Sequence, residues 1–410
     1  MSFTTLGLDP SLLENLTRLG YAEPTPVQRE AIPAALAGGD LLVSSQTGSG
    51  KTAAFVLPSL QRLRAAATRP GKGPRMLVLA PTRELAQQVQ KATHGYCSGQ
   101  KLLTACLVGG VPFGLQLAQV RKPVDIVIAT PGRLKDHLDR RSVDLGRVEL
   151  LVLDEADRML DMGFQEEIDS IVKRAPKERQ TLLFSATLAG VVGNLANRVT
   201  RNAKRIEVKG QEETKPDITQ HALMADNDFH KGRMLDSLLR EVEVDQALVF
   251  TATKRGAAEL TQSLVEKGFT AGSLHGDMQQ KERTRTLNRL RDRSVKVLVA
   301  TDVAARGIDV PGINLVVNYD APRLAQDYVH RIGRTGRAGR AGIAVTFLGS
   351  EDRNLVRQIE RFTGNRVNLM EIPGLEPKKQ HRAQPPVSRN RNEGAARGQR
   401  HQQQRRDRAA

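Results

Sequence analysis

Short apolar runs that recur between longer helical patterns constrain the fold of this chain more than any other feature. In the first half they cover residues 40–45, 76–81, 125–130, 150–154 and 181–186, and in the second half 247–252, 296–301, 314–319 and 343–348. The runs are Leu-rich or β-branched and apolar throughout, which predicts strands buried on both faces. Such strands belong to parallel sheets covered by helices, so each half of the chain predicts one α/β domain.

Changes in composition predict the domain boundaries. We expect a first domain over 1–207, a polar linker over 208–217 and a second domain over 218–374. The segment 375–410 is rich in Arg, Gln, Asn and Pro with almost no apolar residues, which predicts a disordered basic tail.

The net charge of +17 indicates a polyanionic partner such as nucleic acid. Residues 377–410 alone hold ten Lys or Arg and two acidic residues, so much of the excess lies in the tail. Aromatic residues make up 3% of the chain and Trp is absent, which disfavours binding that depends mainly on base stacking. We therefore expect recognition of the nucleic-acid backbone.

Several features favour a cytoplasmic protein. No apolar run approaches the 18 or so residues of a membrane span, and the first residues lack the basic and apolar pattern of a secretory signal. We therefore expect no membrane partner. The two cysteines, Cys97 and Cys106, have no metal-like spacing and are too few for a disulfide scaffold, so we expect reduced thiols.

The stretch "SSQTGSGKT" over 44–52 predicts a phosphate-binding loop between a strand and a helix. Gly48 and Gly50 allow backbone N–H groups to approach phosphate oxygens, Lys51 can reach the β- and γ-phosphates, and the Thr52 hydroxyl can hold Mg²⁺. The strict pattern has Gly at position 45, where this chain has Ser45. A Gly/Ser-rich loop that happens to precede Lys-Thr is the alternative reading.

Carboxylates directly follow an apolar run in "LVLDEADRML" over 151–160. The carboxylates could simply mark the end of a strand where the chain reaches solvent. However, the phosphate-binding loop elsewhere in the chain would supply a bound phosphate on which these carboxylates could act. Asp154 would then hold Mg²⁺, and Glu155 would orient or deprotonate the attacking water.

Eight motifs together resemble the DEAD-box RNA helicases in order and rough spacing, over roughly residues 3–370. They are "GYAEPTPVQ" (20–28), "SQTGSGKT" (45–52), "PTREL" (81–85), "TPGR" (130–133), "DEAD" (154–157), "SAT" (185–187), "TDVAARGID" (301–309) and "HRIGRTGR" (330–337). "DEADRMLDMGF" and the short basic tail are most similar to the bacterial RhlE-type group. The resemblance implies two tandem RecA-like domains.

The resemblance also implies a role for each matching residue. The catalytic set would be Lys51, Asp154, Glu155, Asp157, Ser185, Thr187, His330, Arg334 and Arg337, with Thr52 and Asp154 on Mg²⁺. The ATP-contacting set would be Phe3, Gln28, Gln46, Thr47, Gly48, Ser49, Gly50, Lys51, Thr52 and Asp309. The RNA-contacting set would be Arg83, Gly109, Gly110, Thr130, Gly132, Arg133, Gln280, Arg283 and Thr301.

The function implied is an ATP-dependent RNA helicase that binds single-stranded RNA largely without regard to sequence. It would locally unwind short duplexes or remodel RNA–protein complexes, and its tail could contact ribosomal or RNA-decay proteins. An RNA clamp or annealing chaperone with little ATPase remains an alternative, as does a DNA-directed translocase of the same superfamily.

Deletion of residues 377–410 is expected to weaken RNA binding uniformly across sequences. Each lost phosphate contact should flatten the salt dependence by about 0.7 for single strands. Anisotropy titrations of two unrelated RNAs at several salt concentrations measure this. Loss of affinity for only one of the RNAs would instead make the tail a specific reader.

Overall fold

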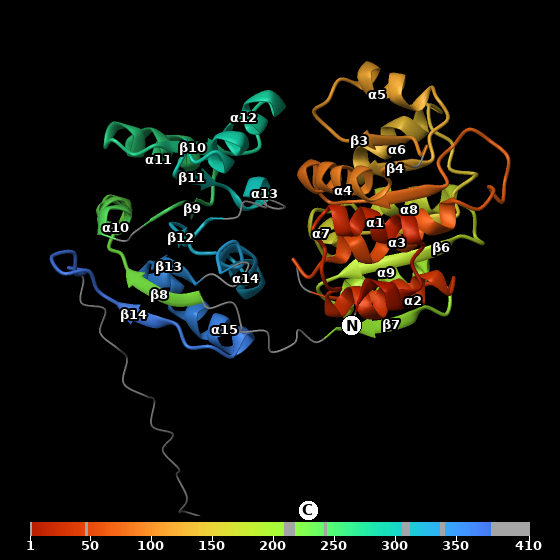
Figure 1. The fold of residues 1–410 in the computed structure, drawn as a ribbon. Helices are drawn as coiled ribbons and strands as arrows, with labels where there is room; N and C mark the ends of the chain where they lie inside the picture. The colour runs from red at the N-terminus through yellow and green to blue at the C-terminus, as the bar shows by residue number, and fades with distance from the viewer. Residues whose placement is uncertain are drawn as a thin grey trace, which may run out of the picture.

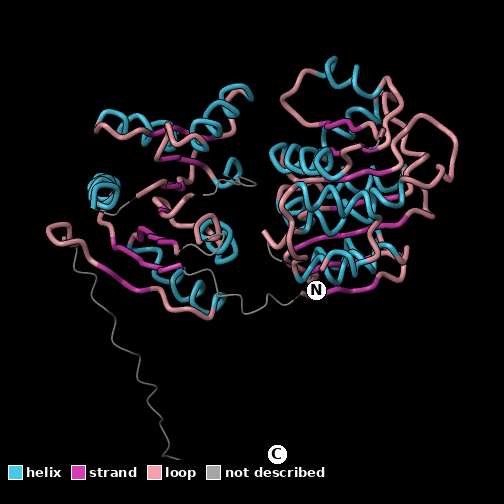
Figure 2. Tube along the Cα trace, viewed as in Figure 1, coloured by secondary structure: helices cyan, strands magenta, loops and turns pink. Residues whose placement is uncertain are grey.

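The computed structural model describes residues 2–45, 48–99, 101–208, 218–241, 244–305, 312–336 and 341–378. Figure 1 shows two α/β domains side by side, the first coloured red to yellow-green and the second green to blue. Figure 2 shows that the strands form the middle of each domain and that helices flank them. The predicted two-domain α/β fold is confirmed.

Domain 1 contains a seven-stranded sheet whose neighbouring strands all pair in parallel, in the order β3-β4-β2-β5-β6-β1-β7. The strands are β1 Leu41–Ser44, β2 Met76–Leu79, β3 Thr104–Leu107, β4 Ile126–Ala129, β5 Leu150–Leu153, β6 Gln180–Ser185 and β7 Lys204–Glu207. The helices are η1 Phe3–Leu6, α1 Pro10–Arg18, α2 Pro26–Leu36, α3 Lys51–Leu63, α4 Arg83–Tyr96, α5 Phe113–Val120, α6 Pro131–Asp139, α7 Ala156–Asp161, α8 Gln165–Arg174 and α9 Gly190–Val199.

Domain 2 contains a second seven-stranded parallel sheet, in the order β10-β11-β9-β12-β13-β8-β14. The strands are β8 Ile218–Met224, β9 Ala247–Phe250, β10 Ala271–Leu274, β11 Val297–Ala300, β12 Leu315–Asn318, β13 Gly342–Leu348 and β14 Asn368–Met370. The helices are α10 Asp228–Glu241, α11 Lys254–Glu266, α12 Gln280–Arg291, α13 Asp302–Ala305, α14 Ala325–Ile332, η2 Ser350–Asp352 and α15 Arg353–Thr363.

The two sheets have the same strand order when each domain is numbered from its own first strand. The shared order is that of tandem RecA-like domains. The domains differ in the loop after that first strand, because β1 leads into the Gly-rich loop and α3, whereas β8 leads through Ala225–Asn227 into α10. Only domain 1 therefore carries a phosphate-loop sequence.

The central strands bury side chains on both faces, which explains their unbroken apolar sequences. Along β2, Val78 packs in a cluster with α1 to α4, whereas Leu77 and Leu79 pack in a cluster with α6 to α9. Domain 2 follows the same rule, since Val249 of β9 faces α10 and α11 while Leu248 faces α12 and α13.

All nine predicted strands are present, and the structure adds β3, β7, β8, β10 and β14. Four of these five lie at sheet edges, and β8 lies next to the edge strand β14. Every residue of β14 is exposed and β7 is exposed except at Ile206, so neither has a run of buried residues that the sequence could reveal.

The predicted tail begins too early. Leu375 packs against the core of domain 2 and its carbonyl lies 2.9 Å from His230 Nε2. The Lys378 N–H donates to Asp226 Oδ2 at 2.8 Å. Apolar packing and two hydrogen bonds therefore extend domain 2 through Lys378. The linker residues 209–217 and the tail residues 379–410 lie outside the described residues.

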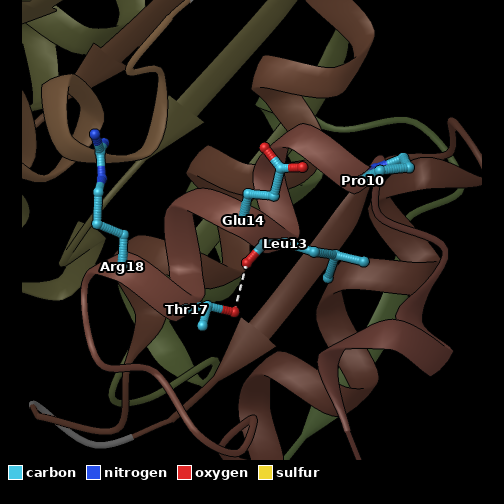
Figure 3. A pocket seen from close by; sticks show the side chains of 5 residues that line it. All are labelled: Pro10, Leu13, Glu14, Thr17 and Arg18. Atoms are coloured by element: carbon cyan, nitrogen blue, oxygen red, sulfur yellow. Dashed lines mark hydrogen bonds between the residues drawn. The ribbon is translucent and has the colours of Figure 1, made fainter.

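The two cysteines of the chain, Cys97 and Cys106, are both unpaired. Within the described ranges, no helix combines the length and apolar character needed to cross a bilayer. A depression of about 530 Å³ on α1 is lined by Pro10, Leu13, Glu14, Thr17 and Arg18 (Figure 3), none of which is a predicted site residue.

A buried ion pair joins β2 to β5 at the end of the sheet where these strands begin. Arg75 donates to both carboxylate oxygens of Glu149, at 2.8 and 3.1 Å, and also to the Leu63 carbonyl at 2.7 Å. The two side chains are 6% and 5% exposed. The additional hydrogen bonds offset part of the cost of burying two charges.

Arg75→Gln is expected to lower the free energy of unfolding of domain 1 by about 3 kcal/mol, because it leaves Glu149 buried without its counter-ion. Urea unfolding measures this. Arg64→Gln is the control, since Arg64 pairs with Asp9 at the surface with side chains 35% and 33% exposed, and should cost less than about 1 kcal/mol. Equal losses of unfolding free energy in the two variants would contradict the stabilising role of the buried Arg75–Glu149 pair.

Candidate functional site

The motifs of domain 1 follow successive strands at the carboxyl edge of its sheet, where open α/β sheets bind ligands. The phosphate loop, the "DEAD" motif and the "SAT" motif follow β1, β5 and β6, which lie together in the sheet. "PTREL", Gly109-Gly110 and "TPGR" follow β2, β3 and β4, which also lie together. The strand order thus separates the candidate ATP half of the edge from the candidate RNA half.

The phosphate loop needs glycine for two physical reasons. Gly48 and Gly50 have φ of +87° and +88°, a region that side chains rarely adopt. A Cβ on Gly50 would also lie 2.5 Å from Nε2 of Gln28. Gly50 is the N-cap of α3, so the loop presents a helix N-terminus to an anion.

Gln28 links the first motif to this loop. Its Nε2 donates to the Gly50 carbonyl at 3.1 Å, and its Oε1 accepts from the Thr25 N–H at 2.9 Å. An amide has two N–H donors and two acceptor lone pairs, so one of each remains for an adenine edge. Phe3 is buried against Tyr21 in an edge-on contact, with ring centroids 6.3 Å apart, and η1 contacts the helix that carries Gln28.

Lys51 is held by its own loop. Its Nζ donates to the Ser45 carbonyl at 3.2 Å, and the side chain is buried. Ser45 is fixed in turn, since its N–H donates to the Ser185 carbonyl at 3.1 Å and its hydroxyl accepts from Ser49 at 3.1 Å. Ser45, which stands where the strict pattern has Gly, therefore takes part in the loop's hydrogen bonding.

The "DEAD" turn places two buried carboxylates at the end of β5. Glu155 has φ 53° and ψ 53°, a left-handed conformation that is costly for a residue other than Gly, Asn or Asp. Glu155 ends the strand sharply and caps α7. Burial raises the pKa of Asp154 and the neighbouring charge of Glu155 raises it further, whereas Lys51 opposes the shift.

Asp154 is suited to a cation. Its Oδ1 is buried and has no hydrogen-bond partner among the described residues. A buried carboxylate oxygen without a donor is stabilised by a metal ion or by water bound to one. Mg²⁺ prefers oxygen ligands and commonly takes one or two from the protein and the rest from phosphates and water, so Asp154 with the hydroxyl of Thr52 fits it.

The third carboxylate, Asp157, contacts the "SAT" motif through the backbone. The Ala186 N–H donates to Asp157 Oδ2 at 3.2 Å. Ser185 and Thr187, the predicted residues, bond to each other, because the Thr187 N–H donates to the Ser185 hydroxyl at 3.3 Å. The motif therefore meets Asp157 at its central residue.

Domain 2 brings α14 to this half of the site, on its side facing domain 1 (Figure 1). Burial lowers the pKa of His330, and the charge of Arg158 lowers it further while Asp157 opposes the shift. His330 is therefore close enough to the "DEAD" motif for its charges to act on the ring. Arg334 is buried one turn further along, with Nε 3.3 Å from the His330 carbonyl.

The candidate RNA half also joins the two domains. Arg83 Nη1 donates to Gln280 Oε1 at 2.8 Å, and Arg283 Nε pairs with Glu84 at 2.6 Å. Arg283 also donates to the Ala304 carbonyl at 2.6 Å, which lies one turn beyond Thr301. Two neighbouring residues of α4 in domain 1 thus contact the first turn of α12 in domain 2.

Gly109 and Gly110 leave room for Arg83. A Cβ on Gly109 would lie 3.2 Å from Arg83 Nη2, and one on Gly110 would overlap Nη1. Burial lowers the pKa of Arg83 and the nearby charges of Arg283 and Arg133 add to the shift, although Glu84 opposes it. Arg283 is itself paired with Glu84, and Arg133 lies 3.7 Å from Asp136, so carboxylates offset part of this positive charge.

The "TPGR" motif forms the start of α6, with Thr130 at the N-cap and Pro131 as the first helical residue. Gly132 follows in the first turn, and Arg133 Nη1 donates to the Val111 carbonyl at 2.8 Å. Arg133 therefore connects this helix to the loop that holds Gly109 and Gly110.

Four predicted residues, Gln46, Thr47, Asp309 and Arg337, lie outside the described residues. The structure adds contacts that the sequence did not suggest. Glu84 forms the cross-domain ion pair, Arg158 pairs with Glu155, and Arg331 pairs with Asp302 through both carboxylate oxygens at 2.6 and 2.7 Å. Only the Glu155–Arg158 spacing of three residues within a short helix could have been noticed in the sequence.

The fold and the site define a two-domain RecA-like protein. Domain 1 carries the phosphate loop, and domain 2 adds Arg283 at the RNA half and His330 at the ATP half. The "DEAD/DEAH box helicase" family model matches residues 25–195, and the "Helicase conserved C-terminal domain" model matches residues 230–339. The chain therefore belongs to the DEAD/DEAH box helicase family.

Individual relatives agree with this assignment. The ATP-dependent RNA helicase DeaD of Buchnera aphidicola subsp. Acyrthosiphon pisum (strain APS) is 44% identical over 381 residues, which cover 92% of this chain and 62% of that protein. The chain thus spans less than two thirds of that relative. The likeness to the RhlE-type group stays a prediction.

Solved structures resemble the whole two-domain arrangement. A variant of S. cerevisiae Dbp5 bound to RNA and ADP BeF3 has a TM-score of 0.81 and 33% identity, over 90% of this chain and 95% of that one. A Dbp5 variant bound to Gle1 and IP6 has a TM-score of 0.71 and 32% identity, over 92% and 95%.

Gly50→Ala is expected to weaken ATP binding about tenfold or more, because a left-handed Ala costs roughly 1–3 kcal/mol and its Cβ would displace Gln28. Calorimetric titration measures the affinity. Gly268→Ala is the matched control, since its φ is +89° and no atom lies within 4 Å of an added Cβ. Equal ATP affinities in the two variants would contradict the role of the Gly50–Gln28 contact.

Proposed function

We propose that this chain is an ATP-dependent RNA helicase that binds single-stranded RNA and locally unwinds short duplexes or remodels RNA–protein complexes. The proposal is carried by the ion pair between the two domains at the RNA half, where Arg283 Nε lies 2.6 Å from Glu84 Oε1. At the ATP half, the charges of Arg158 and Asp157 act on the pKa of His330 of domain 2. One closing movement can therefore complete both sites.

ATP binding follows from the loop geometry. Gln28 retains one donor and one acceptor for the adenine edge, and the N-terminus of α3 attracts the phosphates. Lys51 would exchange the Ser45 carbonyl for the β- and γ-phosphates, which gain more from a cation than a neutral carbonyl does. Gln46, Thr47 and Asp309 are further ATP-contacting residues by family resemblance.

Hydrolysis would use the buried carboxylates. Water attacks the γ-phosphorus, Glu155 accepts the proton, and the bond to the ADP oxygen breaks. Thr52 and Asp154 would hold Mg²⁺, which supplies positive charge to the β- and γ-phosphate oxygens when bound. Arg334 and, by resemblance, Arg337 would stabilise charge on the transferred phosphoryl group. Domain closure is needed because these arginines belong to domain 2.

RNA recognition would depend on the backbone. The guanidinium groups of Arg83, Arg133 and Arg283 form a cationic site, and the glycines beside Arg83 allow close approach of a strand. Contacts with phosphates and 2′-hydroxyls give little sequence preference. The Dbp5 variant to which the chain is similar is bound to RNA and ADP BeF3, which supports this assignment.

Two alternatives remain candidates for the same fold. A clamp with little ATPase would not require Glu155 in a strained, buried position at the end of β5. A DNA-directed translocase would use the same residues on a backbone without 2′-hydroxyls.

We also propose a cytoplasmic location, which the two unpaired thiols support. We extend the proposal to ribosomal or RNA-decay proteins that would contact the tail.

Glu155→Gln is expected to retain ATP and RNA binding but to lower RNA-stimulated turnover by at least about a hundredfold, because an amide cannot accept the proton. Steady-state ATPase and anisotropy titrations separate the two effects. Near-normal turnover in this variant would assign proton acceptance to another group.

A further inference from the structure

Arg158 is a buried cation at the catalytic carboxylates whose role the family motifs leave open. It lies in the first turn of α7, and its Nη1 donates to Glu155 Oε2 at 2.7 Å. The two side chains are 4% and 7% exposed. The left-handed backbone of Glu155 sets the direction in which its side chain leaves the chain, and the guanidinium group of Arg158 binds the carboxylate.

The charge of Arg158 reaches three groups of the site. Burial raises the pKa of Asp154, and the charge of Arg158 opposes that rise. Burial lowers the pKa of His330, and among neighbouring charges Arg158 lowers it most. The charge of Arg158 therefore acts on two groups of the site besides Glu155, to which Arg158 is hydrogen-bonded.

A purely structural ion pair would be built differently. The buried Arg75–Glu149 pair in the same domain is bidentate, and Arg75 also donates to the Leu63 and Ala66 carbonyls. Among the described residues, the Arg158 side chain makes one hydrogen bond, to Glu155. A single bond between two desolvated charges contributes little net stability, so stability alone does not account for Arg158.

We propose that Arg158 is a positioning residue that orients the Glu155 carboxylate for water activation. Arg158 occupies Oε2, which leaves Oε1 to accept from water. The inference rests on the proposed ATP hydrolysis and adds a residue that holds its general base in place.

The test compares Arg158→Gln, Arg158→Lys and Arg75→Gln in the full chain. Arg158→Gln should lower RNA-stimulated kcat about ten- to hundredfold with the KM for ATP and the RNA affinity within about twofold, because a misplaced base affects only the chemical step. Arg158→Lys should recover part of kcat. Arg75→Gln should lower the melting temperature and leave the kcat of the folded protein unchanged.

Two outcomes would overturn the proposal. One is a kcat of Arg158→Gln equal to that of wild type, and the other is a parallel loss of melting temperature, ATP affinity and RNA affinity. Wild-type protein without RNA-stimulated turnover would instead count against the proposed function. In that case, crystal structures of wild type and Arg158→Gln with ADP–beryllium fluoride decide the positioning role. A displaced Glu155 carboxylate in the variant would support the role, and an unmoved carboxylate would overturn it.

Discussion

The parallel register of the two sheets is the constraint on which the rest of the structure depends. Because all neighbouring strands pair in parallel, every loop that leaves a strand at its carboxyl end reaches the same edge. The order β3-β4-β2-β5-β6-β1-β7 then groups three loops at one half of that edge and three at the other. Domain 2 repeats the order, so α12 and α13 face the RNA half while α14 faces the ATP half. The fold itself therefore pairs the two halves of each candidate site.

Local backbone strain and buried charge are concentrated where the chemistry is expected. Glu155 adopts a left-handed conformation, Asp154 is buried with an unpaired oxygen, and Gly50 lies too close to Gln28 to carry a side chain. Such features cost stability, and extensive packing on both faces of the sheet offsets the cost. By contrast, the hydrogen bonds and ion pairs between domains that involve described residues are few, which suits domains that separate and rejoin as ligands bind and leave.

The sequence predicted the central strands well and the edge strands poorly, for one physical reason. Strands such as β2 and β5 are buried on both faces and read as unbroken apolar runs, whereas β7 and β14 expose most of their side chains. The motif residues were predictable because glycines, Lys51 and the carboxylates occur at fixed spacings after strands. Their partners were not, because Gln28–Gly50 and Glu84–Arg283 are contacts between distant segments. Arg158 was overlooked because an Arg at the start of a helix is usually a surface residue.

Steady-state ATPase of the purified chain tests the central claim most directly. Turnover would be measured without nucleic acid, with a single-stranded RNA, and with DNA of the same sequence. We expect strong stimulation by RNA and little by DNA, because closure would join a catalytic site to residues that contact 2′-hydroxyls. Equal stimulation by both would contradict RNA selectivity, and no turnover despite tight RNA binding would contradict the coupling between the two halves of the site.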